Sequence, residues 1–181
     1  MSKKNKIENS YLERKQIKID LITFMYGGLL VRLTKDIKDI SELNTKIENI
    51  GYNIGKRLVD DLIDDFQRVD TSDQNKLMEK LICQLAQYYL GIIGNYSQTG
   101  EKEFHLIFTE NPISLYVELP ESLEGLCYSN IICGILRGML EISGFEIKCE
   151  LVKDKMKGDD INDLKITLVK YIEERFIDDE E

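Results

Sequence analysis

The sequence predicts an α+β fold in which helices pack on a twisted antiparallel sheet. The chain has 181 residues, a length that suits a single domain. Apolar side chains recur at helical spacing through its first 90 residues, whereas residues after 145 alternate between apolar and polar, as strands do. Helices gathered in one part of a chain and strands in another are typical of α+β domains.

The first predicted helix runs from Ser10 to about Lys38. Ser10 and Glu13 have the spacing of a capping box, in which each side chain binds a free amide of the first turn. We expect residues 1–9 to form a flexible, basic N-terminus. The inward face of the helix is predicted to carry Ile17, Leu21, Phe24, Met25 and Gly28.

Two further helices follow. The first of them should be capped by Ser41, and its apolar stripe consists of Leu43, Ile47, Ile50, Ile54, Leu58 and Leu62. After a polar stretch at 67–74, a third helix is expected over Asn75 to Leu90, with Gly91 as its C-cap. Its inward positions are Leu77, Leu81, Leu85 and Tyr88.

The second half of the chain contains the predicted strands. A strand-like segment covers Phe104 to Thr109, and a connection with both prolines leads to an apolar helix over Leu126 to Ile142. The chain then closes with a hairpin that turns at 157–159. The inward positions of the hairpin are Phe145, Ile147, Cys149 and Leu151 on one strand and Leu164, Ile166 and Leu168 on the other.

Two pairs of glycines lie four residues apart, Gly51 with Gly55 and Gly134 with Gly138. A glycine inside a helix costs about 1 kcal/mol relative to alanine, so we expect these pairs to allow close helix packing. The same spacing occurs in membrane helix dimers, but charged neighbours favour packing in a soluble protein. A smooth glycine surface that borders a lipid channel is the alternative.

Composition excludes several classes of protein. A net charge of −9 argues against nucleic-acid binding and against attraction of the whole surface to anionic lipid. The sequence shows no signal peptide and no apolar run of membrane-spanning length, so we expect a cytoplasmic protein. The cysteines at 83, 127, 133 and 149 and the lone His105 lack the spacing of a zinc site, and we interpret the thiols as apolar core residues.

Two aspartate-rich stretches raise the alternative of an enzyme. Residues 60–64 and 159–163 each fit DDxxD, the pattern with which prenyl-diphosphate synthases hold magnesium. The chain is short for such an enzyme, Arg-Arg-Gly does not follow the first cluster, and the second cluster falls in a predicted turn. We therefore expect solvated aspartates and no catalytic residues or metal ligands.

The most informative stretches are TFMYGGLL at 23–30, GYNIGKRLVDD at 51–61, YLGI at 89–92 and the long block from Asn111 to Asp159. Together they resemble the Bet subunits of TRAPP, the transport protein particle, and most of all the Bet three type. The resemblance covers residues 10–176, which it identifies as one Bet-like domain, and leaves 177–181 as an acidic tail. Its motif residues are Gly51, Tyr52, Asn53, Gly55, Tyr128, Asn130, Gly134, Arg137 and Gly138.

The resemblance implies a function as well as a fold. Bet subunits dimerise through their helices, enclose an apolar channel and form non-catalytic parts of a tethering complex that promotes nucleotide exchange on a Rab GTPase. The implied partners are other TRAPP subunits, that Rab and, in isolation, a second copy. The implied location is peripheral, at cis-Golgi and endoplasmic reticulum membranes. A lipid-binding or small-molecule-binding domain of the related bacterial sensor type is the alternative.

The resemblance also points to a channel and to a tail. The family's acylated cysteine aligns with Thr71, whose hydroxyl cannot form a thioester, and Leu85 replaces a smaller residue and would narrow the channel. We expect no cofactor other than a fatty acyl chain in that channel. The tail carboxylates Asp178, Asp179, Glu180 and Glu181 are candidates for contact with the Rab nucleotide site, or else form a solvated end.

Overall fold

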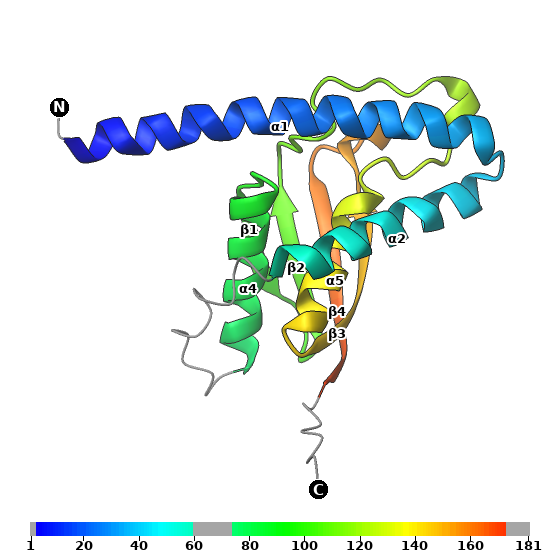
Figure 1. Cartoon of the computed structure of the whole chain (residues 1–181). Helices are drawn as coiled ribbons and strands as arrows, with labels where there is room; N and C mark the ends of the chain where they lie inside the picture. Colours follow the sequence, from blue (N-terminus) through cyan, green and yellow to red (C-terminus); the bar gives the residue numbers. More distant parts are fainter. Residues whose placement is uncertain (1–2, 60–73, 173–181) are drawn as a thin grey trace, which may run out of the picture.

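A computed structural model of the chain describes residues 3–59 and 74–172. Its helices are α1 (Lys3–Asp36), α2 (Ile40–Leu58), α4 (Gln74–Tyr89) and α5 (Asn130–Ile142), with short 3₁₀ helices η2 (Glu121–Leu123) and η3 (Lys155–Lys157). The strands are β1 (Gly94–Gln98), β2 (Glu103–Phe108), β3 (Phe145–Lys153) and β4 (Asn162–Tyr171). The predicted fold class is confirmed, because helices pack on an antiparallel sheet (Figure 1).

The four described strands form one sheet in the order β1-β2-β4-β3, and every neighbouring pair is antiparallel. The predicted hairpin is the β3–β4 pair, and Leu164, Ile166 and Leu168 are buried on one face. The turn contains η3 and Gly158, whose φ of 98° lies in the left-handed region that favours glycine.

Strand β1 was missed in the sequence because its residues, GNYSQ, are mostly polar and show no alternation. Its stability comes from pairing with β2 and from stacking of Tyr96 on Phe104, whose ring centroids are 5.7 Å apart.

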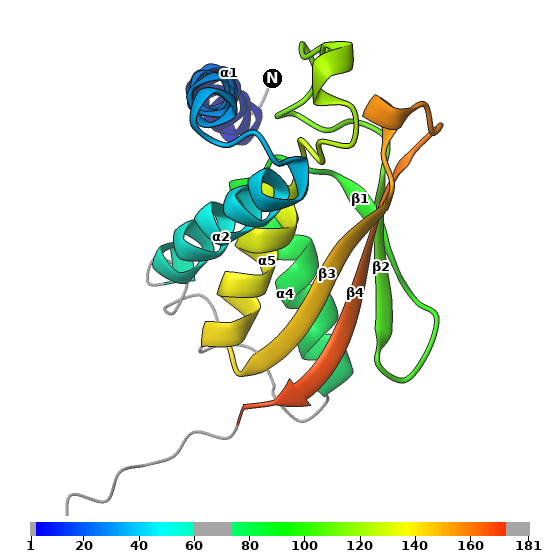
Figure 2. The same ribbon diagram turned by 90° about the vertical axis from the view of Figure 1, so that its right-hand side faces the viewer.

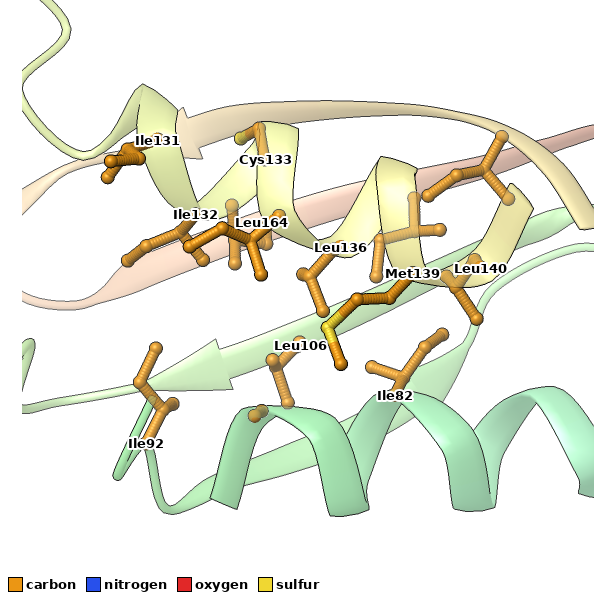
Figure 3. Packing of buried hydrophobic residues seen from close by; sticks show 14 of the residues in the cluster. Ile82, Ile92, Leu106, Ile131, Ile132, Cys133, Leu136, Met139, Leu140 and Leu164 are labelled. Atoms are coloured by element: carbon orange, nitrogen blue, oxygen red, sulfur yellow. The ribbon is translucent and has the colours of Figure 1, made fainter. Parts of the chain in front are cut away.

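The helices form layers on one face of the sheet (Figure 2). Helices α4 and α5 lie next to the strands, α2 lies over α5, and α1 crosses one end of this arrangement. The core forms between α4, α5 and the sheet, where Ile82, Leu106, Leu136, Met139 and Leu164 meet (Figure 3). Helix α5 is buried on nearly every side because it lies between the sheet and α2, which explains its apolar sequence.

The predicted helix ends need three corrections. Helix α1 begins at Lys3, so Ser10 lies inside the helix and is not its cap. Helix α2 is capped by Asp39, whose side chain accepts from the Glu42 amide at 3.0 Å, and the predicted cap Ser41 is wrong. Helix α5 begins at Asn130 instead of Leu126, since η2 and an irregular stretch occupy the preceding residues.

Helix α4 agrees with the prediction to within one residue at each end. The helix ends before Gly91, whose φ of 65° lies in the left-handed region, and the Ile92 amide donates to the Ala86 carbonyl at 2.9 Å. Among the side chains that the structure describes in this helix, Leu81 is buried as expected and Leu77 is half-buried against the core. Met78, Ile82 and Ala86 are buried as well, whereas the predicted inward side chains of Leu85 and Tyr88 are not among those described.

The inward face of α1 was predicted wrongly. Leu21, Phe24, Met25 and Gly28 are exposed, and the helix turns other side chains, Thr23, Tyr26 and Leu30, toward the rest of the chain. The stretch 21–31 is apolar almost all round, so its periodicity does not single out one face. Among the helices that the structure describes, none is both long enough and apolar enough to cross a membrane.

Helix α2 carries the predicted stripe only in part. Leu43 and Ile47 are fully buried, while Ile50 and Leu58 are half-buried and Ile54 is exposed. Gly51 and Gly55 continue the buried face in place of the larger residues. Leu62 lies outside the described residues.

Candidate functional site

The glycines singled out in the sequence lie where α2 crosses α5. A Cβ atom added to Gly51 would lie 2.2 Å from the carbonyl oxygen of Ile131, and one added to Gly55 would lie 2.2 Å from that of Ile135. Real Cβ atoms essentially never approach another heavy atom within 3.0 Å. The backbone of α5 therefore occupies the space that a side chain at either position would need.

The glycines of α5 show the same arrangement in reverse. A Cβ atom on Gly134 would lie 2.0 Å from the Glu48 carbonyl oxygen, and one on Gly138 would lie 2.2 Å from the Tyr52 carbonyl oxygen. Each helix thus presents two glycines to the backbone of the other. The two helices approach backbone to backbone over about one turn of each.

A polar cluster borders this crossing. The Tyr52 hydroxyl donates to the Glu141 carboxylate at 2.6 Å, and Lys56 lies 5.3 Å from the centre of the Tyr52 ring. Arg137 lies over the same ring at 4.9 Å and forms an ion pair with Glu48. The Lys56 contact lies within α2, whereas the Tyr52–Glu141 hydrogen bond, the Arg137–Glu48 ion pair and the Arg137–Tyr52 cation–π contact connect α2 to α5 beside the glycines.

The other motif asparagines lie at different depths. Asn53 is exposed and donates to the Asn49 carbonyl in its own helix at 3.0 Å. Asn130 donates to the Asn44 carbonyl at 3.1 Å, which connects the first turn of α5 to α2. Asn44 itself donates to the Gly125 carbonyl at 3.1 Å and accepts from the Cys127 amide at 2.8 Å.

Asn44 could not be singled out in the sequence, because a lone asparagine on a helix carries no signal of its distant partners. The three hydrogen bonds join residues more than 80 positions apart in the chain. They hold the segment that precedes α5 against α2, and so fix where α5 begins.

Tyr128 anchors α1 to the rest of the chain. Its carbonyl accepts a short hydrogen bond from the Tyr26 hydroxyl, and the two rings meet edge to face at 4.9 Å. Thr23 adds a hydrogen bond to the Pro112 carbonyl at 3.3 Å. Burial raises the pKa of Tyr26 well above its usual range. The Tyr128 hydroxyl is buried and has no hydrogen-bond partner within the described residues.

An apolar cavity of ≈ 220 Å³ lies between α1, α2, α5 and the C-terminal end of α4. Its lining consists of Ile22, Tyr26, Ile54, Leu58, Tyr89, Leu90, Ile113, Ile131, Ile132 and Ile135. The isoleucine side chains and the two aromatic rings make a lining suited to hydrocarbon.

Helix α1 also presents an apolar surface to solvent. We call it the α1 apolar surface, and it consists of Leu21, Ile22, Phe24, Met25, Leu29 and Val31. Phe24 is 77% exposed. Contiguous apolar side chains on the outside of a soluble chain mark an interaction surface more often than isolated ones do.

The titratable residues considered in the sequence are engaged in structural contacts. His105 lies 2.7 Å from the Asp163 carboxylate across the β2–β4 pair. Asp159 accepts from the Asp154 amide at 2.7 Å in the β3–β4 turn. The described residues contain no group of three or more histidine, cysteine, aspartate or glutamate side chains arranged to hold a metal ion.

The cysteines are free thiols, and they differ in exposure. Cys133 is fully buried, whereas Cys83, Cys127 and Cys149 are half-buried. A hydrogen bond with Cys149 and burial raise the pKa of Cys133 above its usual range. Burial also raises the pKa of Cys83. The expectation that these thiols are core residues is therefore confirmed for Cys133, and Cys149 is half-buried against the core.

Several predicted positions fall outside what the structure describes. Thr71, the first DDxxD cluster at 60–64 and the acidic tail residues 178–181 lie beyond the described ranges. Leu85 lies in α4, but its side chain is among those that the structure does not describe.

Comparison with known proteins places these features in a family. The family model described as "Transport protein particle (TRAPP) component" matches residues 22–167. Trafficking protein particle complex subunit 3 of Dictyostelium discoideum is 35% identical over 178 residues, which make up 95% of each chain. Trafficking protein particle complex subunit BET3 of Saccharomyces cerevisiae is 31% identical over 163 residues, 88% of this chain and 84% of the yeast protein.

A solved structure agrees with these matches. It is that of a trafficking protein particle complex subunit 3 from Naegleria fowleri covalently bound to palmitic acid. It has a TM-score of 0.79 and 32% sequence identity to this chain, and the match covers 87% of this chain and 99% of that one. The family match spans most of the chain, including the α2–α5 crossing and its glycines, and the chain therefore belongs to the TRAPP component family.

Proposed function

We propose that this protein is a non-catalytic subunit of the TRAPP complex, of the Bet three type, which supports vesicle transport between the endoplasmic reticulum and the Golgi. The observation that carries the proposal is the similarity to subunit 3, which extends over 95% of both chains. In this proposal the subunit is cytoplasmic, peripheral at cis-Golgi and endoplasmic reticulum membranes, and contributes to nucleotide exchange on a Rab GTPase as part of the assembled complex. It carries no exchange activity of its own.

Affinity purification from the native source, followed by mass spectrometry, tests membership in the complex. We expect other TRAPP subunits to co-purify in a stoichiometric assembly. Recovery of a lone dimer with a bound small molecule would instead support the alternative, a lipid-binding or small-molecule-binding domain of the bacterial sensor type. The apolar cavity of ≈ 220 Å³ is the observation that keeps that alternative worth testing.

We propose that the isolated protein is a homodimer through the α1 apolar surface. Each Å² of apolar surface that is buried contributes about 25 cal/mol to the free energy of association. Burial of several large apolar side chains is therefore a strong driving force for dimer formation. Sedimentation equilibrium at micromolar concentration should show a species of twice the 21.0 kDa chain. A monomer across that range would contradict the proposal.

A matched pair of variants locates the dimer contact. Phe24→Glu places a charge on the α1 apolar surface, where Phe24 is 77% exposed. Ile93→Glu makes a comparable change at a residue that is 82% exposed and lies outside α1. We expect only Phe24→Glu to give a monomer, because only that carboxylate would have to be buried in the contact.

We propose that the apolar cavity accepts a fatty acyl chain without a covalent bond. The Naegleria fowleri relative is covalently bound to palmitic acid, but a thioester needs a thiol and Thr71 has only a hydroxyl. The intact mass of the purified protein should show no palmitoyl adduct. An added palmitoyl mass that neutral hydroxylamine removes would refute this expectation.

We also propose that Leu85 narrows the channel that holds the acyl chain. The variant Leu85→Ala should then increase uptake of a fluorescent fatty acid.

We propose that the tail carboxylates Asp178, Asp179, Glu180 and Glu181 approach the Rab nucleotide site, where negative charge would weaken binding of phosphate and magnesium. A complex with full-length protein is compared with one in which the chain stops after Phe176. Equal assembly with slower nucleotide release would support this role. Equal release rates at low and physiological salt would leave the carboxylates as a solvated end.

A further inference from the structure

A long groove separates α1 from the segment that precedes η2. Two hollows of ≈ 680 Å³ and ≈ 550 Å³ lie along α1 and share Gly27, Tyr116, Val117 and Tyr128 in their linings, so they form one continuous groove. On the helix side the lining runs from Asp20 to Thr34. At 1.5 Å per residue this is about 21 Å, the length of roughly six residues of extended chain.

The opposite wall of the groove is the extended segment Val117–Pro120, which belongs to no strand of the sheet. Its exposure alternates as in a strand, because Val117 and Leu119 are half-buried against the core while Glu118 and Pro120 are exposed. Pro120 has the extended dihedral angles φ −69° and ψ 154°. The residue before a proline is also biased toward extended geometry, which applies to Leu119.

The main-chain N–H and C=O groups in the middle of this segment are free to bind a partner. Glu118 and Leu119 make no hydrogen bond, through either N–H or C=O, to any described residue. Four consecutive residues of the segment line the groove even though their side chains alternate in exposure. The groove is therefore bordered by the main chain of residues 117–120 as well as by their side chains. An open strand edge is a template for pairing with another extended chain.

Charge and polarity narrow the choice of occupant. Asp20 and Glu118 line the groove, and neither forms an ion pair with a described residue. The cation in the lining, Lys38, is already held by the Thr34 carbonyl at 3.0 Å. Apolar side chains such as Leu30 share the lining with the hydroxyls of Thr34 and Ser122. This mixture suits a peptide better than a hydrocarbon chain.

We propose that this groove binds an extended segment of a partner protein that combines apolar residues with a lysine or arginine. The segment lies extended beside Val117–Pro120 and forms main-chain hydrogen bonds with the one of Glu118 and Leu119 whose N–H and C=O face the groove, because neighbouring residues of an extended chain turn these groups to opposite sides. Its apolar side chains lie along the α1 side of the groove, and its cation meets Glu118 or Asp20. The groove shares Phe24 and Val31 with the α1 apolar surface, but it shares no lining residue with the apolar cavity between the helices.

The test uses the full-length protein and a phage-displayed library of random twelve-residue peptides. The strongest binder is synthesised, and its effect on amide hydrogen exchange is measured. The Glu118 and Leu119 amides are both unpaired in the free protein, and the bound peptide should slow exchange of the one that faces the groove by at least about tenfold. Binding that protects other amides, or a screen that yields no binder in the micromolar range, would overturn the proposal.

A pair of charge reversals, one inside the groove and one outside it, provides the control. Glu118→Lys should weaken binding of the peptide by about tenfold, because it replaces an attraction with a repulsion inside the groove. Glu124→Lys changes an exposed glutamate that lies outside the groove lining, and it should alter binding by less than about twofold. Equal effects of the two variants would overturn the proposal.

A second copy of this chain is the competing occupant. In that case, protection of the Glu118 or the Leu119 amide would appear in the protein alone and would rise with its concentration as dimers form. That result would assign the groove to self-association and overturn binding of a partner segment.

Discussion

Replacement of Gly134 by alanine is the sharpest test of the α2–α5 crossing. The added methyl carbon would lie 2.0 Å from the Glu48 carbonyl oxygen and 2.8 Å from the Tyr52 nitrogen, and both are backbone atoms. Ordinary contact begins at 3.4 Å. The oxygen would therefore have to move by 1.4 Å, the difference between these two distances, and it cannot move without the helix that carries it.

The expected magnitude follows from two opposing effects. Alanine is favoured over glycine in a helix interior by about 1 kcal/mol. Overpacking a core costs about 1–3 kcal/mol and sometimes more, and the cost here lies at the upper end because no flexible side chain can yield. We expect Gly134→Ala to lower the free energy of unfolding by about 2 kcal/mol. For a chain of this size that corresponds to a fall in Tm of about 4–8 °C.

Urea unfolding, followed by circular dichroism at one fixed protein concentration, measures the change. Gly28→Ala is the matched control, since Gly28 is exposed in the helical segment α1 and a Cβ atom there would meet nothing within 4 Å. This control should raise stability by up to about 1 kcal/mol. If Gly134→Ala also raised stability, the backbone contact between α2 and α5 would be refuted.

Three further outcomes are expected. Burial raises the pKa of Tyr26, so only the unfolded chain loses the Tyr26 proton near pH 10. The contribution of Tyr26 to the free energy of unfolding should therefore be fully present below about pH 10 and should fall above it. In thermal melts from pH 8 to 11, Tyr26→Phe should make Tm fall less steeply with pH. Asn44→Ala should lower the free energy of unfolding by about 1–2 kcal/mol, because two hydrogen bonds of its side chain are lost. If urea titrations showed that the free energy of unfolding falls by less than about 0.3 kcal/mol, this expectation would be contradicted. With a thiol-specific reagent at neutral pH, half-buried Cys127 should react well before buried Cys133, and Cys127→Ser should remove a fast phase.

The sequence by itself determined the fold class, most helices and the hairpin. Regular periodicity is a local property, so the stripe of Leu164, Ile166 and Leu168 predicted a strand with one buried face before any partner was known. Gly91 was predictable for the same reason, because a helix that stops in the left-handed conformation favours glycine whatever surrounds it. The family resemblance was likewise carried by the sequence itself, in motifs that run through the whole chain.

Only the tertiary structure decided which face of α1 is buried, that β1 is a strand, and what His105 and Asn44 contact. Each of these depends on partners far away in the chain: Tyr128 for α1, Phe104 for β1 and Asp163 for His105. Where a segment is apolar all round or polar throughout, its own pattern does not select a face. The selection then comes from the side chains and backbone that the fold brings against it.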